Sequence, residues 1–225
     1  MTEDTEKSEA LTGISEIVAT LEEEIALGKM GPRERLVEEE LAQRFDVKRH
    51  VARQALADLE TMGLVVRLPR RGATVRDYGV AEIEQLYAAR QLVECYAAGL
   101  IELPAAPSLI EALRAIHERH STAVERGDLR RVFRENLLFH KTFFAACGNV
   151  PLVEVIEMLA MKTHAIRSFS IGDPVILAAV CREHAEMIEL LQDGNQQRLI
   201  ELVGQHLQPA KNAYLKLARH RAPMA

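Results

Sequence analysis

Residues 36–75 have the sequence LVEEELAQRFDVKRHVARQALADLETMGLVVRLPRRGATV, which decides the fold of the first part of the chain. Apolar residues recur every three or four positions over 36–45 and again over 51–62, which predicts two helices separated by a short turn. Gly63 is expected to end the second helix. Two short apolar runs flank the segment 69–72, whose Pro and Gly favour a tight turn, so they predict a β-hairpin. Helix, turn, helix and hairpin in this order are typical of a winged helix-turn-helix.

Positive charge is concentrated in this stretch. Residues 44–76 contain eight Lys and Arg against three Asp and Glu, whereas the whole chain has a net charge of −5. Donors at the start of the second helix of such a fold face base edges in the major groove. A solvated basic helix followed by an ordinary hairpin is the alternative that charge alone leaves open. The residues predicted to contact DNA are Lys48, Arg49, His50 and Arg53 on the helix, and Arg70, Arg71 and Gly72 at the hairpin tip.

The same stretch carries a resemblance to a known family. The chain resembles the GntR-type transcription regulators at residues 35–38 (RLVE), 63–64 (GL) and 71–75 (RGATV). The resemblance implies a winged helix-turn-helix that binds double-stranded DNA, and it adds Arg35 to the predicted contacts. The chain departs from the family pattern at Lys48 and within residues 50–54. These departures lie on the DNA-facing surface, so they leave the operator sequence open and the fold intact.

The composition is that of a two-domain, mostly helical protein. With 225 residues, 48% of them hydrophobic, 4% aromatic and none of them Trp, the chain favours Leu- and Ala-rich helical cores over a β-sandwich. Cys95, Cys147 and Cys181 are isolated within helical patterns, which indicates reduced thiols rather than disulfides. Because no apolar run is long enough to span a membrane and no leader opens the chain, we expect a soluble, cytoplasmic protein with no membrane partner.

The predicted fold class is mainly α, an N-terminal winged helix-turn-helix followed by an antiparallel all-α bundle of about six helices. Residues 1–9 are polar and are expected to be disordered. Residues 10–77 form the predicted DNA-binding domain, residues 78–80 a hinge, and residues 81–220 an all-helical domain for metal, effector and dimerisation. The helices predicted in the last domain cover about 81–103, 108–126, 129–147, 151–170, 173–192 and 195–219.

Three histidines lie within the apolar stripes of three different predicted helices. His140, His184 and His206 are each in helical register with aliphatic or aromatic neighbours, and Asn136 lies one turn before His140. One inward histidine is usually a hydrogen-bonded core residue, but three are hard to satisfy among themselves. A divalent cation would accept the lone pairs of neutral imidazoles, and Zn, Ni, Fe or Mn suit such ligands. The spacing leaves a metal site and a hydrogen-bonded core equally open.

Two arginines are candidates for binding an anion. Arg90 lies on the inward stripe of its predicted helix, and a buried guanidinium needs an anionic partner. Either Glu94, four residues later, or a bound carboxylate supplies that partner. Arg167, at the end of a predicted helix, is a second candidate anchor, and a solvated helix-end arginine explains it equally well. His117 and His120 are expected to be surface or flank residues.

The helical half resembles the FCD effector domain of the FadR subfamily of GntR-type regulators, and its helix number is more similar to the smaller VanR-type variant. In many relatives an Asp and three His hold a metal, and the Asp position corresponds to Asn136. The resemblance therefore implies a divalent metal at Asn136, His140, His184 and His206, with Arg90 and the metal gripping the carboxylate of a small organic acid. The matching residues are Arg90, Glu94, Asn136, Phe139, His140, Gly148, Asn149, Glu183, His184, Ile188, His206 and Leu207.

These interpretations predict a ligand-responsive transcription regulator, with a repressor as the commoner arrangement in the family. Two subunits would associate through their helical domains and present two recognition helices to a pseudo-palindromic operator. A metal sensor, for which the cation itself is the signal, is one alternative. A metallo-hydrolase is another, but Glu183 projects about 100° away from His184 on the same helix and leaves the site without a general base. We therefore expect no enzyme.

Overall fold

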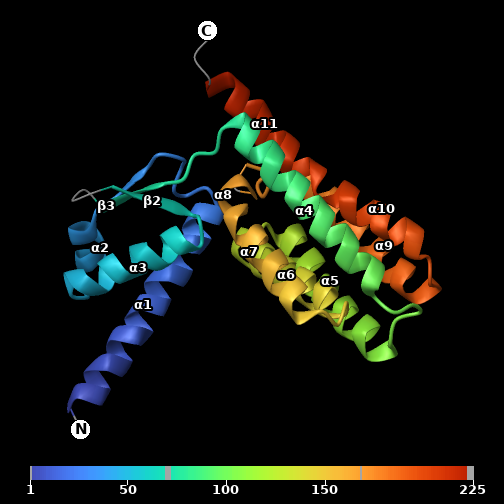
Figure 1. The fold of residues 1–225 in the computed structure, drawn as a ribbon, viewed down its shortest axis with the longest axis horizontal. Helices are drawn as coiled ribbons and strands as arrows, with labels where there is room; N and C mark the ends of the chain where they lie inside the picture. The colour runs from blue at the N-terminus through green and yellow to red at the C-terminus, as the bar shows by residue number, and fades with distance from the viewer. Residues whose placement is uncertain (1, 69–71, 168, 222–225) are drawn as a thin grey trace. The chain divides into compact units, whose positions relative to one another are not determined.

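The structure is a computed structural model that describes residues 2–68, 72–167 and 169–221. It divides into two compact units, which are considered one at a time. The first unit comprises Met1–Asp77 together with Met161–Ala165, and the second comprises Tyr78–Ala160 with Ile166–Ala225. Most described residues are helical, and the described strands form one small sheet (Figure 1). The predicted fold class is therefore confirmed.

The first unit combines three helices with a three-stranded antiparallel sheet of order β1-β3-β2. The predicted helix-turn-helix and hairpin are both present. Strand β1 was not predicted, because two residues are too few to show an alternating pattern. The elements of this unit are α1 (Thr2–Ala26), β1 (Arg35–Leu36), α2 (Glu38–Arg44), α3 (Arg49–Thr61), β2 (Val65–Leu68) and β3 (Gly72–Val75).

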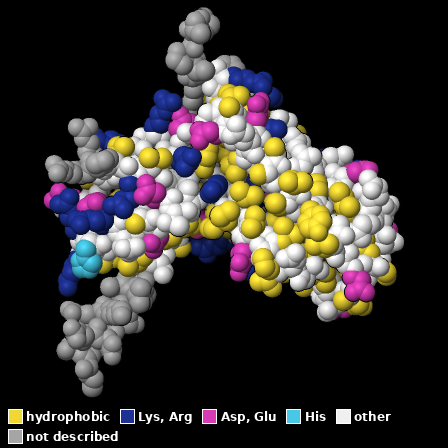
Figure 2. All heavy atoms as spheres, viewed as in Figure 1, with side chains coloured by type: hydrophobic (Ala, Val, Ile, Leu, Met, Phe, Trp, Pro, Cys, Tyr) yellow, Lys and Arg dark blue, Asp and Glu magenta, His cyan; other side chains and the backbone are white. Residues whose placement is uncertain are grey.

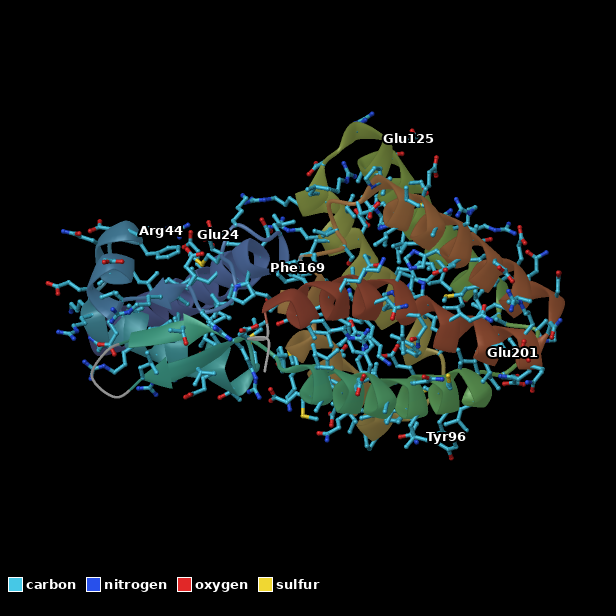
Figure 3. The ribbon with its side chains drawn as sticks, turned by 90° about the horizontal axis from the view of Figure 1, so that it is seen from above. Glu24, Arg44, Tyr96, Glu125, Phe169 and Glu201 are labelled. Atoms are coloured by element: carbon cyan, nitrogen blue, oxygen red, sulfur yellow. The ribbon has the colours of Figure 1, made fainter. Side chains whose placement is uncertain are left out.

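Helix α1 supports the other two helices of this unit. Its apolar stripe, which includes Leu21 and Ile25, joins the buried side chains of α3 in one hydrophobic core. At its edge Arg44 of α2 pairs with Glu24 of α1, with Nη2 2.5 Å from Oε1 (Figure 3). The helix begins at Thr2, although we expected disorder over residues 1–9. Those residues include neither Gly nor Pro, so nothing in the sequence interrupts the helix there.

The second unit consists of helices alone among the residues described. All six predicted helices are present, and two of them are divided. Pro209 has no amide hydrogen and its ring crowds the preceding turn, so the last predicted helix breaks at Leu207. The helices that lie wholly or partly in this unit are α4 (Val80–Leu100), α5 (Pro107–Arg126), α6 (Leu129–Ala145), α7 (Val150–Lys162), α8 (His164–Arg167), α9 (Pro174–Asp193), α10 (Gln196–His206) and α11 (Gln208–Arg221).

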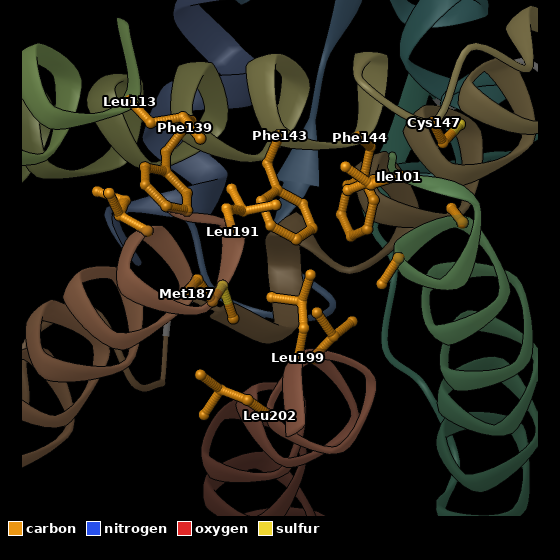
Figure 4. Close-up of a cluster of buried hydrophobic side chains, with 14 of the residues drawn as sticks. Ile101, Leu113, Phe139, Phe143, Phe144, Cys147, Met187, Leu191, Leu199 and Leu202 are labelled. Carbon is orange, nitrogen blue, oxygen red and sulfur yellow. The ribbon is translucent and has the colours of Figure 1, made fainter. Parts of the chain in front are cut away.

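The core of the second unit forms where α5, α6, α9 and α10 pack together, with α4 against α10. Figure 4 shows Phe139, Phe143 and Phe144 projecting from α6 toward Leu191 and Leu199. Side-chain caps fix where several of these helices begin. Asp173, for example, accepts hydrogen bonds from the first backbone amides of α9, as its position before Pro174 predicts. No helix among the described residues is long and apolar enough to cross a membrane.

Tyr78, which we placed in a hinge, is a fixed part of the second unit. Its side chain is buried, and its backbone amide donates to the hydroxyl of Tyr214 at 3.0 Å. The same hydroxyl donates to the carbonyl of Tyr78 at 3.4 Å. These contacts attach the start of α4 to α11 from Tyr78 onward.

Residues 161–165, which we placed in the helical domain, belong to the first unit instead. Ala165 is buried in the core of that unit. His164 Nδ1 lies 2.9 Å from the carboxylate of Glu22 on α1. Lys162 packs so closely on Gly63 that a Cβ atom at Gly63 would lie 2.9 Å from its Cγ. The sequence showed only a continuing helical pattern here, because these contacts join positions far apart in the chain.

Candidate nucleic-acid interface and ligand site

One face of α3 carries the basic residues predicted to contact DNA. Lys48 at the N-cap and Arg49, His50 and Arg53 in the first turns are all exposed, whereas the opposite face of the helix is buried. Figure 2 shows Lys and Arg side chains gathered on the surface of this unit. The N-terminal end of α3 is therefore accessible to base edges and phosphates.

A single carboxylate contacts both arginines of this face. Arg49 Nε donates to Glu38 Oε2 at 3.0 Å, and Arg53 Nε donates to the same oxygen at 3.3 Å. Burial opposes ionisation of Glu38, but the two hydrogen bonds and the charges of the arginines outweigh it and lower the pKa of Glu38. Sequence reasoning missed this role, since Glu38 lies 11 and 15 residues from its partners.

The base of the wing is set by Gly72. Its φ is +82°, and an added Cβ would clash with the carbonyl oxygen of Leu36 on β1. A backbone requirement therefore explains Gly72 without any DNA contact. Arg35, on the neighbouring strand, is exposed. Arg70 and Arg71, predicted at the wing tip, lie outside the described residues.

The three predicted imidazoles come together in the second unit. His140 on α6, His184 on α9 and His206 on α10 offer nitrogens that all lie within 4.8 Å of one another. Nε2 of His140 is 3.2 Å from Nε2 of His206. The ring centroid of His184 lies 5.2 Å from that of His140 and 5.0 Å from that of His206. We call these three residues the first histidine set.

His184 shows what this set needs. Its side chain is fully buried, and neither ring nitrogen has a hydrogen-bond partner among the described residues. Such an unpaired buried group costs about 1–3 kcal/mol. Burial lowers the pKa of His140 and His184 well below the ordinary value, and nearby His206 adds to this, so both rings are neutral at pH 7. Neutral imidazoles with lone pairs are the donors that Zn, Ni, Fe and Mn accept, so these residues fit a metal.

Glu183 supports the first set from behind. Its Oε2 lies 2.6 Å from Nδ1 of His206, which directs Nε2 of that ring toward His140. A carboxylate on the far nitrogen of a histidine is the usual supporting arrangement at metal sites. Sequence reasoning placed Glu183 away from the site, because it considered only His184 on the same helix and not a ring from α10.

The expectation that His120 lies on the surface or the flank of its helix was wrong. His120 is completely buried, and with His117 and His184 it forms a second set of three nitrogens that lie within 4.8 Å of one another. Burial lowers the pKa of His120 to about 4, with the charges of His117 and His206 adding to it. The signal was present in the sequence, since Leu113, His120 and Ala123 fall on one helical stripe.

A cavity of about 80 Å³ adjoins both histidine sets. This space corresponds to roughly five to eight water-sized volumes, enough for a small organic molecule. Its walls are largely apolar and include Phe133, Ile176 and Leu177. The polar side chains that line it are Arg90, His120, Asn136, Arg167, Ser170 and His206.

The two predicted arginines both line this cavity but differ in their partners. Arg90 is buried, and its Nε donates to Glu94 Oε1 at 2.7 Å, so the structural partner considered from the sequence is present. Arg167 has a buried Nη1 atom with no hydrogen-bond partner among the described residues. Burial lowers the pKa of Arg167 to about 10, and the positive charge of Arg90 adds to this. The cavity therefore has an unsatisfied cationic wall.

Two known families match separate stretches of the chain. Residues 14–75 match the bacterial regulatory proteins of the gntR family, and residues 85–209 match the FCD domain. The chain belongs to the GntR family. It has the helix-turn-helix of that family in its first unit and an FCD domain in its second, as the resemblance in the sequence implied.

Curated and solved relatives agree with this assignment. From Escherichia coli K12, the HTH-type transcriptional regulator McbR is 25% identical over 171 residues, 76% of each chain, and the repressor RspR is 25% identical over 193 residues, 86% of this chain and 85% of its own. The solved structure of E. coli McbR/YncC superposes with a TM-score of 0.79 at 18% identity, covering 91% of this chain and 98% of its own. The structure of a GntR transcriptional regulator from Rhodococcus sp. RHA1 superposes with a TM-score of 0.76 at 21% identity. The match covers 90% of this chain and 97% of that chain. At such identities the solved structures show the fold alone.

This GntR-family chain is thus a transcription regulator, and regulators of this family bind DNA operators. Its homologues and its fold are those of regulators rather than enzymes, which removes the metallo-hydrolase alternative.

Proposed function

We propose that this GntR-family regulator is a repressor whose FCD domain binds a divalent metal and a small carboxylate, and that the carboxylate changes its affinity for an operator. The observation that carries the proposal is the buried, unpaired Nη1 of Arg167 in the wall of a cavity that His206 and Asn136 also line. A guanidinium in such a place needs an anion. The name of the relative RspR, a transcriptional repressor, supports the direction of regulation.

The metal would be held by His140, His184 and His206, with the amide oxygen of Asn136 as the fourth candidate donor. An amide carries no charge, so the cation would keep its full positive charge toward the cavity. When bound, the metal supplies a Lewis-acidic position for a carboxylate oxygen. Arg167, and Arg90 alongside Glu94, would orient the same anion from the other wall.

DNA recognition is assigned to α3. Lys48, Arg49, His50 and Arg53 would face the major groove, and Arg35 with the wing residues Arg70 and Arg71 would contact the backbone. Gly72 would serve only to shape the wing. The effector acts on this surface if it binds two conformations of the regulator unequally.

A homodimer would present two copies of α3 to a pseudo-palindromic operator. The helical unit offers a surface for such an association. Leu92, Tyr96 and Leu100 lie four residues apart on α4 and are 72%, 61% and 40% exposed. Figure 3 shows Tyr96 pointing outward from α4, and hydrophobic side chains gather on the same unit in Figure 2. An exposed apolar stripe of this kind supports pairing with a second copy.

Calorimetric titration with short mono-, di- and tricarboxylates tests the ligand assignment. We expect Arg167→Leu to weaken binding of the tightest-binding carboxylate by roughly 10- to 100-fold, which corresponds to the free energy of a hydrogen bond to a charged group. Arg126→Leu is the matched control, because Arg126 is exposed at the end of α5. Unchanged affinity in Arg167→Leu would refute the anion site. Operator release by metal alone, without any carboxylate, would favour the metal-sensor alternative.

A further inference from the structure

We propose that His117, His120 and His184 form a second metal site in the FCD domain, and that one cation occupies either this site or the first set at a given time. The two sites would share His184. The second site needs only these three imidazoles, so it stands even if the first set holds no metal.

Four buried nitrogens on three rings, all without partners among the described residues, point to a ligand here. Nε2 of His120 and Nδ1 of His117 are buried and have no hydrogen-bond partner among the described residues, and the same holds for both nitrogens of His184. His120 and His184 are fully buried, so bulk water does not satisfy them. A cation that accepts imidazole lone pairs gives one nitrogen of each of the three rings a partner at once.

Cys181 prepares His120 for this role. Its Sγ lies 3.6 Å from Nδ1 of His120, and when Nδ1 carries the ring proton and donates to the thiol, the lone pair of Nε2 is left for a cation. This contact is the counterpart of the one between Glu183 and His206 in the first set. In both sets the far nitrogen of one ring is held by a neighbouring polar side chain, as it is at metal sites.

The shared histidine limits occupancy to one cation. A neutral imidazole has one nitrogen with a lone pair and one that carries the proton. If both sets use the same nitrogen of His184, only one lone pair is available. If they use different nitrogens, the second carries the proton while the first is bound. In either case His184 serves one cation at a time.

The chemistry of the two sets differs. The first set has the carboxylate of Glu183 behind it, whereas the second consists of imidazoles with a thiol behind them. Nitrogen-preferring cations such as Ni²⁺, Cu²⁺, Zn²⁺ and Co²⁺ therefore suit the second set. His120 and His206 both line the cavity, so a carboxylate there adjoins whichever set is filled.

Titration of the full-length chain with Co²⁺, followed by its visible absorption, tests the proposal. Four proteins are compared: wild type, the first-site variant His140→Ala with His206→Ala, the second-site variant His117→Ala with His120→Ala, and His184→Ala. We expect the wild type and both double variants to bind one Co²⁺ per chain. His184→Ala should bind more than roughly tenfold more weakly than either double variant.

Two results would overturn the proposal. The second site does not exist if the first-site variant binds Co²⁺ no more tightly than His184→Ala. Two Co²⁺ per wild-type chain would contradict alternate occupancy. If the second-site variant and His184→Ala both lose Co²⁺ while the first-site variant keeps it, the second site stands, and both the first set proposed above and alternate occupancy are wrong. Anomalous diffraction from Co²⁺-loaded wild-type crystals locates the ion without any substitution, which keeps the test decisive if a double variant does not fold.

Discussion

Glu38 accepts hydrogen bonds from Arg49 and Arg53, the two guanidinium groups that α3 offers to DNA. DNA phosphates and this carboxylate compete for the same donors. Exposed ion pairs of this kind contribute about 0.2–1 kcal/mol each. We therefore expect Glu38→Gln to raise the affinity for non-specific DNA by roughly two- to fivefold, measured by fluorescence anisotropy at several salt concentrations.

Glu40→Gln is the matched control for Glu38→Gln. It removes the same charge from an exposed position of α2 that, among the described residues, makes no hydrogen bond or ion pair with either arginine. An equal gain in both variants would show that net charge, rather than release of Arg49 and Arg53, accounts for the effect.

Substitution of Gly72 tests the tight packing at the base of the wing. Gly72→Ala combines a positive φ with a clash against the Leu36 carbonyl. Gly127, with φ +68° and open space around the missing Cβ, isolates the cost of φ alone, which is roughly 1–2 kcal/mol. We expect Gly72→Ala to lower the free energy of unfolding by about 1–3 kcal/mol more than Gly127→Ala does. Hydrogen exchange, read separately for each unit, provides the measurement, and equal losses would mean that β1 shifts without cost.

At the scale of elements, helical periodicity predicted the six long helices and the inward positions of His140, His184 and His206. The same rule places His120 on the buried stripe of α5, although a surface or flank position was expected. Periodicity does not show contacts between elements. The Glu183–His206 contact and the attachment of residues 161–165 to the first unit join segments that no local pattern relates.

Packing of α5, α6 and α9 around neutral imidazoles makes the metal-free protein sensitive to acid. Burial lowers the pKa of His120, His140 and His184, whereas unfolded histidines titrate near about 6.5. The unfolded chain therefore binds more protons below pH about 6.5, and stability falls as pH decreases. For His120, with a folded pKa of about 4, the full loss is about 3 kcal/mol.

Urea unfolding of chelator-treated protein between pH 7.5 and 5 measures the part of this loss that develops above pH 5, which is roughly 2 kcal/mol for His120. Carboxylates contribute little in that window, because their unfolded pKa values lie near about 4. A His120→Asn variant should show a shallower pH dependence. A flat profile in the wild type would mean that these rings are not buried and neutral in the metal-free protein.

At the scale of the whole molecule, the exposed stripe on α4 predicts the oligomeric state. Leu92→Glu places a charge at the most exposed residue of this stripe and should convert a dimer to a monomer, as measured by sedimentation. Operator affinity should fall with it, because one subunit contacts only one half-site. Val175→Glu is the control, since Val175 on α9 is 75% exposed outside the stripe. Dissociation by both variants, or by neither, would remove α4 from the interface.

The discontinuous make-up of the first unit constrains the engineering of hybrid regulators. A fusion that joins residues 1–77 to a foreign sensor domain keeps the whole helix-turn-helix. It omits the segment 161–165, which carries Ala165 and the His164 ring that lies beside Glu22. The hybrid protein would then expose the apolar surface that Ala165 covers and leave the Glu22 carboxylate without the His164 ring. A hybrid that also carries residues 161–165, or whose sensor domain supplies an equivalent apolar segment, should be the more stable protein.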